Sequence, residues 1–562
     1  MKLQTRSREA SSSRRAQPGS SVVRAMLCVL SIAGAASPIP VWADSGEKVS
    51  VATGPARIGK APAALERYIE RAVQDWGVPG MAMAIIKDDE IVFARGFGVR
   101  NSETREPATA QTVFGIGSVT KSVTATAIAM LVDDGKLTWD TPVKDYVPEF
   151  ETYDPYVTSQ LSLRDIAAHR TGIEDANYLQ RRPTHRAENI HHPTRADIVR
   201  AFKHLRPSDS FRNSFAYKNV TWVPAGAAIE AAAGMSWDQF VHERIFAPLG
   251  MSRSSTSVNE TDVLQDVSSA HVFVQGKLAP IPLVNADVPG PMGSVNASVV
   301  DLAQYVRFHM GDGTFEGKRL LRKDSLAELH RPHVVDAGET FTSGTPFTKQ
   351  VSYSLGWWVQ DYRGYKLVRH AGAVVGGNAN VFYIPEKKIG VVLLANGGSM
   401  SMLAAAALRT LDTYLDVPLY DWYARVVEAE PARLKKPLSP AFEAAMAERA
   451  KTRIQGTRPS LDLSRYAGVY RNPVYGDLHF IREGDKLTAR LWTFTGELAH
   501  WNYDTFSLNW DERHHYLHVG PEMQNLVRFD LDERGELSKV SFLGLGIFER
   551  LPDSPSAGAS GD

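Results

Sequence analysis

The hydrophobic pattern between residues 60 and 415 alternates between helical and strand spacing. Helices are predicted over 64–75, from 118 to about 134, and over 225–233, 299–310 and 402–414. Strands are predicted over 81–87, 91–98, 353–359, 365–370, 378–384 and 390–395. Because strand pairs stand at both ends with helices between them, the pattern predicts an α+β (α/β) domain. Its antiparallel sheet is flanked by helices and completed by strands distant in sequence.

The pattern changes near residue 461 to short alternating strands. These are predicted over 466–470, 478–480, 486–491, 506–508, 516–519 and 527–529. Turn signals at intervals of roughly 8–12 residues are typical of a small antiparallel barrel or sandwich, which we place at 461–552. The charged segment 421–460 is predicted to be a helical connector, and the Ser-, Gly- and Ala-rich tail 553–562 to be disordered.

The N-terminus is typical of an export signal. Arginines precede the apolar run 25–36, and Ala43 supplies a small residue before a predicted cleavage site. We therefore expect residues 1–43 to be a signal peptide, 44–60 a linker and 61–420 the main domain of a bacterial periplasmic or secreted protein. The run is too short for a comfortable membrane span, so no stable membrane insertion is expected after cleavage. The single cysteine, Cys28, lies in this segment, so the mature chain has no disulfide and no thiol nucleophile.

Charge and histidine spacing exclude other classes of partner. Lys plus Arg number 63 and Asp plus Glu number 63, so no basic excess indicates nucleic acid. Four histidines cluster before residue 205, but without the spacing that a zinc site needs (His185, His191, His192 and His204). We expect no metal and no cofactor. A homo-oligomer is compatible with the sequence.

The strongest chemical signal is Ser118-Val119-Thr120-Lys121, which follows a Gly-rich approach and opens a long helix. Three residues are almost one helical turn, so the hydroxyl and the amine share a face. A serine needs a neighbouring base to act as a nucleophile, and a lysine kept neutral by burial can serve. Backbone N–H groups at a helix start favour a developing oxyanion.

Two further segments supply candidate site residues. Tyr217 and Asn219 form Y-x-N; the phenol is a candidate general base or proton relay, and nearby cations would then have to lower its pKa below about 10. His370 and Gly372 form H-x-G at a predicted strand end, where the histidine can bind substrate and the N–H of Ala373 can complete an oxyanion hole with that of Ser118.

The order S-x-x-K, Y-x-N, H-x-G and the sequence around each motif resemble the serine β-lactamase and penicillin-binding-protein superfamily. The resemblance covers about residues 60–415 and is to class C β-lactamase-related serine hydrolases of the D-aminopeptidase and esterase-like branch. It implies that Ser118 is acylated, Lys121 activates it, and Tyr217 is the base or relay. It also implies substrate binding by Asn219 and His370. The segment 163–172 resembles another family motif, in which His169 is expected to orient a loop.

The same resemblance shapes the expected function. β-Lactamases carry a lysine where this chain has His370, which favours a peptidase or esterase over a β-lactamase. The C-terminal part resembles a lipocalin-like barrel appended to some of these peptidases. We expect a serine hydrolase with a small-molecule or short-peptide substrate, and specifically a peptidase that cleaves amide bonds of short linear peptides, including peptides with D- or non-ribosomal residues. The alternatives are a carboxylesterase or β-lactamase-like enzyme, and a non-catalytic sensor that forms an acyl adduct.

Overall fold

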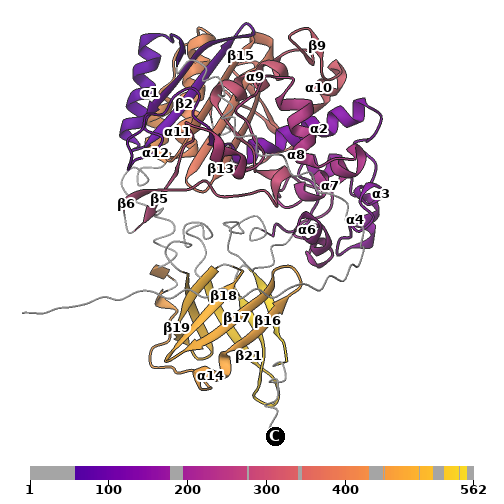
Figure 1. The fold of residues 1–562 in the computed structure, drawn as a ribbon, viewed down its shortest axis with the longest axis vertical. Helices are drawn as coiled ribbons and strands as arrows, with labels where there is room; N and C mark the ends of the chain where they lie inside the picture. The colour runs from indigo at the N-terminus through magenta and orange to yellow at the C-terminus, as the bar shows by residue number, and fades with distance from the viewer. Residues whose placement is uncertain are drawn as a thin grey trace, which may run out of the picture. The chain divides into compact units, whose positions relative to one another are not determined.

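The computed structural model describes most of the chain between residues 57 and 552 (Figure 1). The described ranges are 57–176, 194–274, 277–338, 345–429, 447–448, 450–492, 494–510, 525–542 and 545–552. The predicted signal peptide, nearly all of the predicted linker and the C-terminal tail lie outside these ranges, as do His185, His191 and His192. No helix within the described ranges combines the length and the apolar character needed to cross a membrane.

The first domain contains a nine-stranded antiparallel sheet in the order β1-β3-β2-β15-β14-β13-β12-β11-β10. The strands are β1 (Arg57–Gly59), β2 (Gly80–Lys87), β3 (Glu90–Gly98), β10 (Val334–Val335), β11 (Val351–Tyr353), β12 (Trp358–Tyr362), β13 (Tyr365–Val374), β14 (Gly377–Ile384) and β15 (Ile389–Ala395). The N-terminal hairpin β2–β3 joins the C-terminal strands because Met81 to Lys87 of β2 pair with β15. This pairing confirms the prediction that distant strands complete one sheet.

Three helices cover one face of this sheet: α1 (Ala63–Asp75), α11 (Met400–Tyr414) and α12 (Trp422–Ala429). The buried residues of α1 are Leu65, Ile69, Ala72 and Val73, which recur at helical spacing and form one apolar stripe. α12 falls within the segment predicted as a helical connector, and its Trp422 is fully buried in the same hydrophobic cluster. The indole N–H of Trp422 donates to Asp412 of α11 at 2.8 Å.

The other face carries α2 (Thr120–Asp133) and α9 (Val299–Met310), together with a group of shorter helices. These are α3 (Val143–Tyr146), α4 (Pro155–Gln160), α5 (Leu163–Ala167), α6 (Arg195–Ala201), α7 (Trp222–Ala233) and α8 (Trp237–Val241), with α10 (Lys323–Leu329) packed against α2 (Figure 1). Every residue of α2 from Thr120 to Leu131 is buried. A helix buried on all sides is held in one position, which suits the element that begins at Ser118.

The predicted strand over 353–359 is wrong as a single element. The chain forms β11 and β12, and the residues between them turn at Gly356, whose φ is 79°. A Cβ at Gly356 would lie 3.0 Å from the carbonyl oxygen of Lys121, so the turn packs directly on the start of α2. The apolar run Leu355-Gly356-Trp357-Trp358 has strand character, and the left-handed glycine interrupts it.

Short pieces connect these elements in the first domain. They are the strands β4 (Phe114–Gly115), β5 (Ala270–Val274), β6 (Lys277–Ile281), β7 (Asn296–Ala297), β8 (Thr314–Phe315) and β9 (Lys318–Arg319), and the 3₁₀ turns η1 (Gly117–Val119), η3 (Phe202–His204), η5 (Val258–Val263), η6 (Gly290–Met292) and η7 (Pro385–Lys387), with the π-helical turn η4 (His242–Phe246). β4 pairs with β7, which brings the segment before Ser118 beside the segment that follows Met292.

The second domain is a closed antiparallel barrel of eight strands, which confirms the predicted small antiparallel barrel and not the strand number. Its elements are α14 (Leu463–Tyr466), β16 (Gly468–Asn472), β17 (Gly476–Glu483), β18 (Lys486–Leu491), β19 (Phe494–Asn502), β20 (Thr505–Trp510), β21 (Asn525–Leu531), β22 (Leu537–Phe542) and β23 (Gly546–Arg550). Tyr466 ends α14 instead of opening the first strand, and the analysis missed β19, β22 and β23. The predicted strand 516–519 lies outside the described residues. Aromatic side chains fill the barrel (Tyr466, Tyr470, Phe480, Phe506, Phe529 and Phe548 are at most 2% exposed).

Candidate active site

Ser118 stands on the turn η1, immediately before α2, and its side chain is partly exposed. Its N–H lies in the first turn of a helical segment, where N–H groups have no intrahelical acceptor. The preceding Gly117 has φ 52°, and a Cβ there would lie 2.5 Å from the carbonyl oxygen of Ala373. A glycine is therefore required for the chain to turn into α2 against β13.

Lys121 is fully buried and its Nζ has three polar neighbours. Nζ lies 2.9 Å from Ser118 Oγ, 2.8 Å from Asn219 Oδ1 and 2.8 Å from the carbonyl oxygen of Met292. A neutral amine has two N–H bonds and one lone pair. The carbonyl of Met292 and the amide oxygen of Asn219 accept the two N–H bonds, so the lone pair is left for the hydroxyl of Ser118.

Burial also favours the neutral form of this lysine. Loss of solvation lowers the pKa of Lys121 to about 7, although the nearby carboxylate of Asp175 acts in the opposite direction. At a pH slightly above neutral the amine is largely unprotonated and can accept the proton of Ser118. The geometry and the pKa therefore agree with the predicted pairing of a serine nucleophile and a lysine base.

We expect kcat/KM to rise with pH through a single ionisation near pH 7, because only unprotonated Lys121 can accept the serine proton. The rate should reach a plateau above about pH 8, one unit beyond that pKa. Histidines do not produce this limb, since burial holds the pKa values of both His169 and His370 well below 6.5. A kcat/KM profile from pH 5 to 9 measures it. A flat profile across pH 6–8 would contradict the assignment.

Tyr217 reaches Ser118 from the loop before α7, and the two side chains are hydrogen-bonded. The sequence analysis required nearby cations to lower the pKa of this phenol. The structure corrects that expectation, because burial raises the pKa of Tyr217 well above 10. Lys121 Nζ lies 5.1 Å from the ring centroid, but an uncharged amine does not stabilise a phenolate. Tyr217 is thus a neutral phenol that can donate a proton, and Lys121 is the better candidate base.

Asn219 is oriented by Asp175, a residue that the sequence analysis missed. Asp175 Oδ1 accepts from the backbone N–H groups of Asn219 and Val220, each at 3.2 Å, and Oδ2 accepts from Asn219 Nδ2 at 3.4 Å. The amide oxygen of Asn219 consequently points to Lys121. Asp175 lies ten residues after Asp165 in a loop, and no local pattern distinguishes it from other loop carboxylates.

The sequence also does not predict the hydrogen bond from Lys121 to the carbonyl oxygen of Met292. The segment of η6 that carries its carbonyl packs closely on α7, since a Cβ at Gly226 would lie 2.2 Å from the ring of Pro291. Thr124 of α2 donates to the carbonyl of Pro291 at 2.7 Å. A backbone acceptor carries no side-chain signature, so sequence reasoning has nothing from which to identify it.

His370 lies on β13 and is fully buried. Its Nε2 is 3.1 Å from the hydroxyl of Tyr353, and its Nδ1 is 2.7 Å from the carbonyl of Ala371. Since a carbonyl only accepts, Nδ1 carries the proton and the hydroxyl of Tyr353 donates to Nε2. Both ring nitrogens are thus hydrogen-bonded within the protein. Substrate binding by His370 remains a prediction, and it would require one of these two hydrogen bonds to be replaced by a bond to the substrate.

The backbone of Ala373 lies against the nucleophile turn. Val374 and Gly377 close a two-residue hairpin, so the N–H of the preceding residue, Ala373, points away from β14. On the other side of β13, the pairing with β12 ends at Arg369, so β12 does not bind this N–H. A Cβ at Gly117 would lie 2.8 Å from the nitrogen of Ala373. The backbone nitrogen of Ala373 therefore lies beside the turn that carries Ser118, and its N–H is a candidate second donor for an oxyanion hole with that of Ser118.

Gly372 allows this close approach, and its replacement should disable the site. A Cβ at Gly372 would lie 1.9 Å from the carbonyl oxygen of Ile116 and 3.0 Å from the nitrogen of Ser118. We expect Gly372→Ala to displace β13 from the nucleophile and to lower kcat by about 10²-fold. Steady-state kinetics and a melting curve measure the effect. Gly311→Ala is the control, because its nearest contacts would be ordinary ones of 3.4 Å or more.

His169 stacks on Tyr217 and contacts the loop that carries it, as a residue that orients this loop would. Its Nδ1 accepts from the backbone N–H of Lys218 at 3.0 Å, and Trp222 Nε1 is 3.3 Å from its Nε2. Both ring nitrogens face N–H donors, so a protonated imidazolium would lack an acceptor. This geometry and burial both favour the neutral ring.

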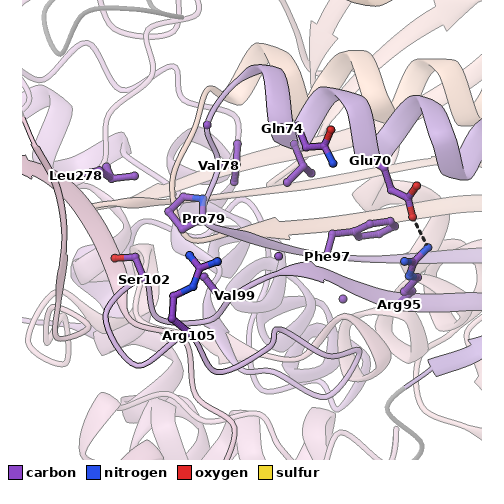
Figure 2. A pocket seen from close by; sticks show the side chains of 14 residues that line it. Glu70, Gln74, Val78, Pro79, Arg95, Phe97, Val99, Ser102, Arg105 and Leu278 are labelled. Carbon is purple, nitrogen blue, oxygen red and sulfur yellow. Dashed lines mark ion pairs between the residues drawn. The ribbon is translucent and has the colours of Figure 1, made fainter.

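A separate surface pocket lies between α1 and β3 and does not include the residues above. It has a volume of about 560 Å³ and is lined by apolar side chains such as Val78 and Phe97, with Arg105 at its centre (Figure 2). Arg95 in its wall forms ion pairs with Glu66 and Glu70, at 2.9 and 2.8 Å.

Comparison with known families agrees with the two-domain architecture. The family described as Beta-lactamase matches residues 65–414, and a domain of unknown function, DUF3471, matches residues 452–549. The unguisins hydrolase ungD of Aspergillus violaceofuscus is 26% identical over 440 residues, which cover 74% of this chain and 76% of that protein. Penicillin-binding protein 4 of Amycolatopsis lactamdurans is 29% identical over 338 residues, which cover 59% of this chain and 85% of that protein.

Solved structures show the same fold. An octameric penicillin-binding protein homologue from Pyrococcus abyssi has 25% sequence identity and a TM-score of 0.55, and the match covers 87% of this chain and 98% of that chain. The D-alanine carboxypeptidase AmpC from Burkholderia cenocepacia has 21% identity and a TM-score of 0.50 over 62% of this chain and 99% of that chain.

Proposed function

Because this chain belongs to the Beta-lactamase family of serine hydrolases, we propose that it cleaves amide bonds of short linear peptides through an acyl-enzyme on Ser118. The observation that carries the proposal is the 2.9 Å contact between Ser118 Oγ and the buried, largely neutral amine of Lys121. Lys121 takes the hydroxyl proton as Oγ attacks the substrate carbonyl. The N–H groups of Ser118 and Ala373 stabilise the tetrahedral oxyanion.

The state of Tyr217 favours an amide over an ester substrate. When the tetrahedral intermediate collapses, an amine leaving group must receive a proton, whereas an alkoxide can leave without one. A phenol whose pKa is raised by burial keeps its proton at neutral pH and is hydrogen-bonded to the nucleophile. Tyr217 is therefore placed to protonate the leaving nitrogen, and Lys121 then returns a proton to Tyr217. Water hydrolyses the acyl-serine and completes the cycle.

The test is a digest of mixed linear peptides that contain L- and D-residues, followed by mass spectrometry. We expect the parent protein to cleave a subset of them, and the cut sites will give the preferred residues and their stereochemistry. Matched amides and esters of the same acyl group give the relative kcat/KM for the two bonds. Turnover of the esters alone would replace the peptidase with an esterase, and a stable adduct without turnover would indicate a sensor.

We also propose that the protein is exported, with residues 1–43 removed, and that it forms a homo-oligomer. The N-terminal pattern of arginines and an apolar run supports export. The octameric state named for the relative from Pyrococcus abyssi supports assembly. N-terminal sequencing of protein from the culture medium and periplasm, and light scattering of the mature chain, test these two points.

A further inference from the structure

The ring of Tyr217 stacks on two aromatic partners. Its centroid is 4.1 Å from that of His169, with 28° between the planes, and 5.5 Å from the centroid of Trp358, with 6° between the planes. The phenol that is hydrogen-bonded to Ser118 is thus held by two stacking contacts.

Trp358 is itself fixed by two charged residues. Its indole N–H donates to Asp336 Oδ2 at 3.0 Å, and the guanidinium carbon of Arg369 lies 5.2 Å from the ring centroid. Arg369 pairs with Trp358 across β12 and β13, and its Nε donates to Gln360 Oε1 at 2.7 Å. A tryptophan anchored by its N–H and covered by a cation has little freedom to rotate.

The neighbouring Trp357 has different surroundings from those of Trp358. Trp357 is fully buried among Tyr305, His309 and Tyr383, and its indole N–H has no hydrogen-bond partner among the described residues. Trp358 is partly exposed, has a carboxylate acceptor, and contacts Tyr217 and His370 of the candidate site. Of the two tryptophans, only Trp357 has the environment of a core aromatic residue.

We infer that Trp358 is a positioning residue for Tyr217, held in place by Asp336 and Arg369, so that the phenol hydroxyl stays aimed at Ser118. This inference rests on the proposed function, in which that hydroxyl transfers a proton. Proton transfer requires hydrogen-bond distance, and a tyrosine that rotates about its side-chain torsions would carry the hydroxyl away from it. Substrate need not touch Trp358 for this role, so its loss should lower kcat with little change in KM.

The test is a double-mutant cycle with Tyr217→Phe, measured with alanine 4-nitroanilide as the amide and 4-nitrophenyl acetate as the activated ester. We expect Trp358→Leu to lower kcat for the anilide by about 10- to 100-fold with KM within about twofold. Trp358→Phe, which keeps a ring for stacking, should recover most of this loss. In the Tyr217→Phe background Trp358→Leu should change kcat by less than about twofold, because the hydroxyl that it positions is gone.

Two further variants distinguish the loss of this positioning role from a general loss of folding. Asp336→Ala removes the acceptor of the indole N–H at a partly exposed position, and we expect a smaller loss of kcat in the same direction. Trp237→Phe is the matched control, because Trp237 is buried under Arg195, 5.5 Å above its ring, and contacts none of the site residues. It should leave kcat unchanged.

The outcomes separate this inference from the proposed function. An equal effect of Trp358→Leu in both backgrounds, or no effect of Trp358→Leu and Asp336→Ala in the parent, would overturn the positioning role alone. If the parent turns over only the ester, the peptidase proposal fails and the positioning role fails with it, because the nitrophenolate leaves without a proton from Tyr217. If the parent cleaves neither probe nor any peptide of the digest, both proposals are overturned.

Discussion

Replacement of Ser118 by alanine is expected to abolish turnover, with kcat falling on the order of 10⁴-fold or more. The loss has this size because the hydroxyl forms the bond to the acyl group, and no other described hydroxyl has both a neutral amine within 2.9 Å and the N–H of Ala373 at hand. Steady-state kinetics measures the loss. In the parent, mass spectrometry after rapid quenching with a slow substrate should place the added acyl mass on the peptide that contains Ser118.

Ser122→Ala is the matched control for this prediction. Ser122 lies one turn further along the same helix, is fully buried, and donates its hydroxyl to the carbonyl of Val119 at 2.7 Å. Its loss should affect stability slightly and leave the acyl adduct intact. An adduct that persists in Ser118→Ala, or residual turnover within tenfold of the parent, would exclude Ser118 as the nucleophile.

Replacement of Lys121 by arginine should lower kcat/KM by about 10²- to 10⁴-fold. Arginine keeps a long basic side chain but remains protonated at any working pH, so it has no lone pair to accept the proton of Ser118. The amine that fits between Ser118, Asn219 and Met292 is also smaller than a guanidinium. The measurement is kcat/KM as a function of pH, in which the ionisation near pH 7 should disappear with the lysine.

Lys121→Ala supplies a chemical test of the same role. The truncated side chain leaves space beside Ser118 Oγ, and added methylamine should restore part of the activity when it is unprotonated. Ser118→Ala should show no such rescue. Activity of Lys121→Arg close to that of the parent would show that the lysine orients the serine without serving as its base.

The residues that sequence reasoning could identify are those whose chemistry follows from local spacing. Ser118 and Lys121 are one turn apart, and that spacing alone predicts a shared face, which the 2.9 Å contact confirms. The strands β2 and β3 follow from two strand-like runs joined by a polar turn, and the pairing of β2 with β15 follows from the need to complete a sheet. The eight-stranded barrel follows in outline from short strands at regular turn intervals.

Other features depend on tertiary contacts that no local pattern contains. The carbonyl of Met292 is a backbone group, and its importance comes only from the segment that packs between α2 and α7. The pKa of Tyr217 moves upward because burial dominates, whereas the sequence shows only that cations are present. Trp357 and Trp358 are adjacent tryptophans in one apolar run, so the sequence does not distinguish them. Only the folded structure shows that Trp358, and not Trp357, contacts Tyr217.

The buried amine that the proposed activity requires, that of Lys121, lowers the stability of the folded protein. Between about pH 7 and 10.5 an unfolded chain binds a proton on this lysine and the folded chain does not, so the free energy of unfolding falls as the pH is lowered through that range. An apolar residue of similar length in the same place would make the protein more resistant to heat and inactive. A search for stabilising substitutions in this family should therefore find some of its largest gains in stability at this lysine position, where the same substitutions abolish activity.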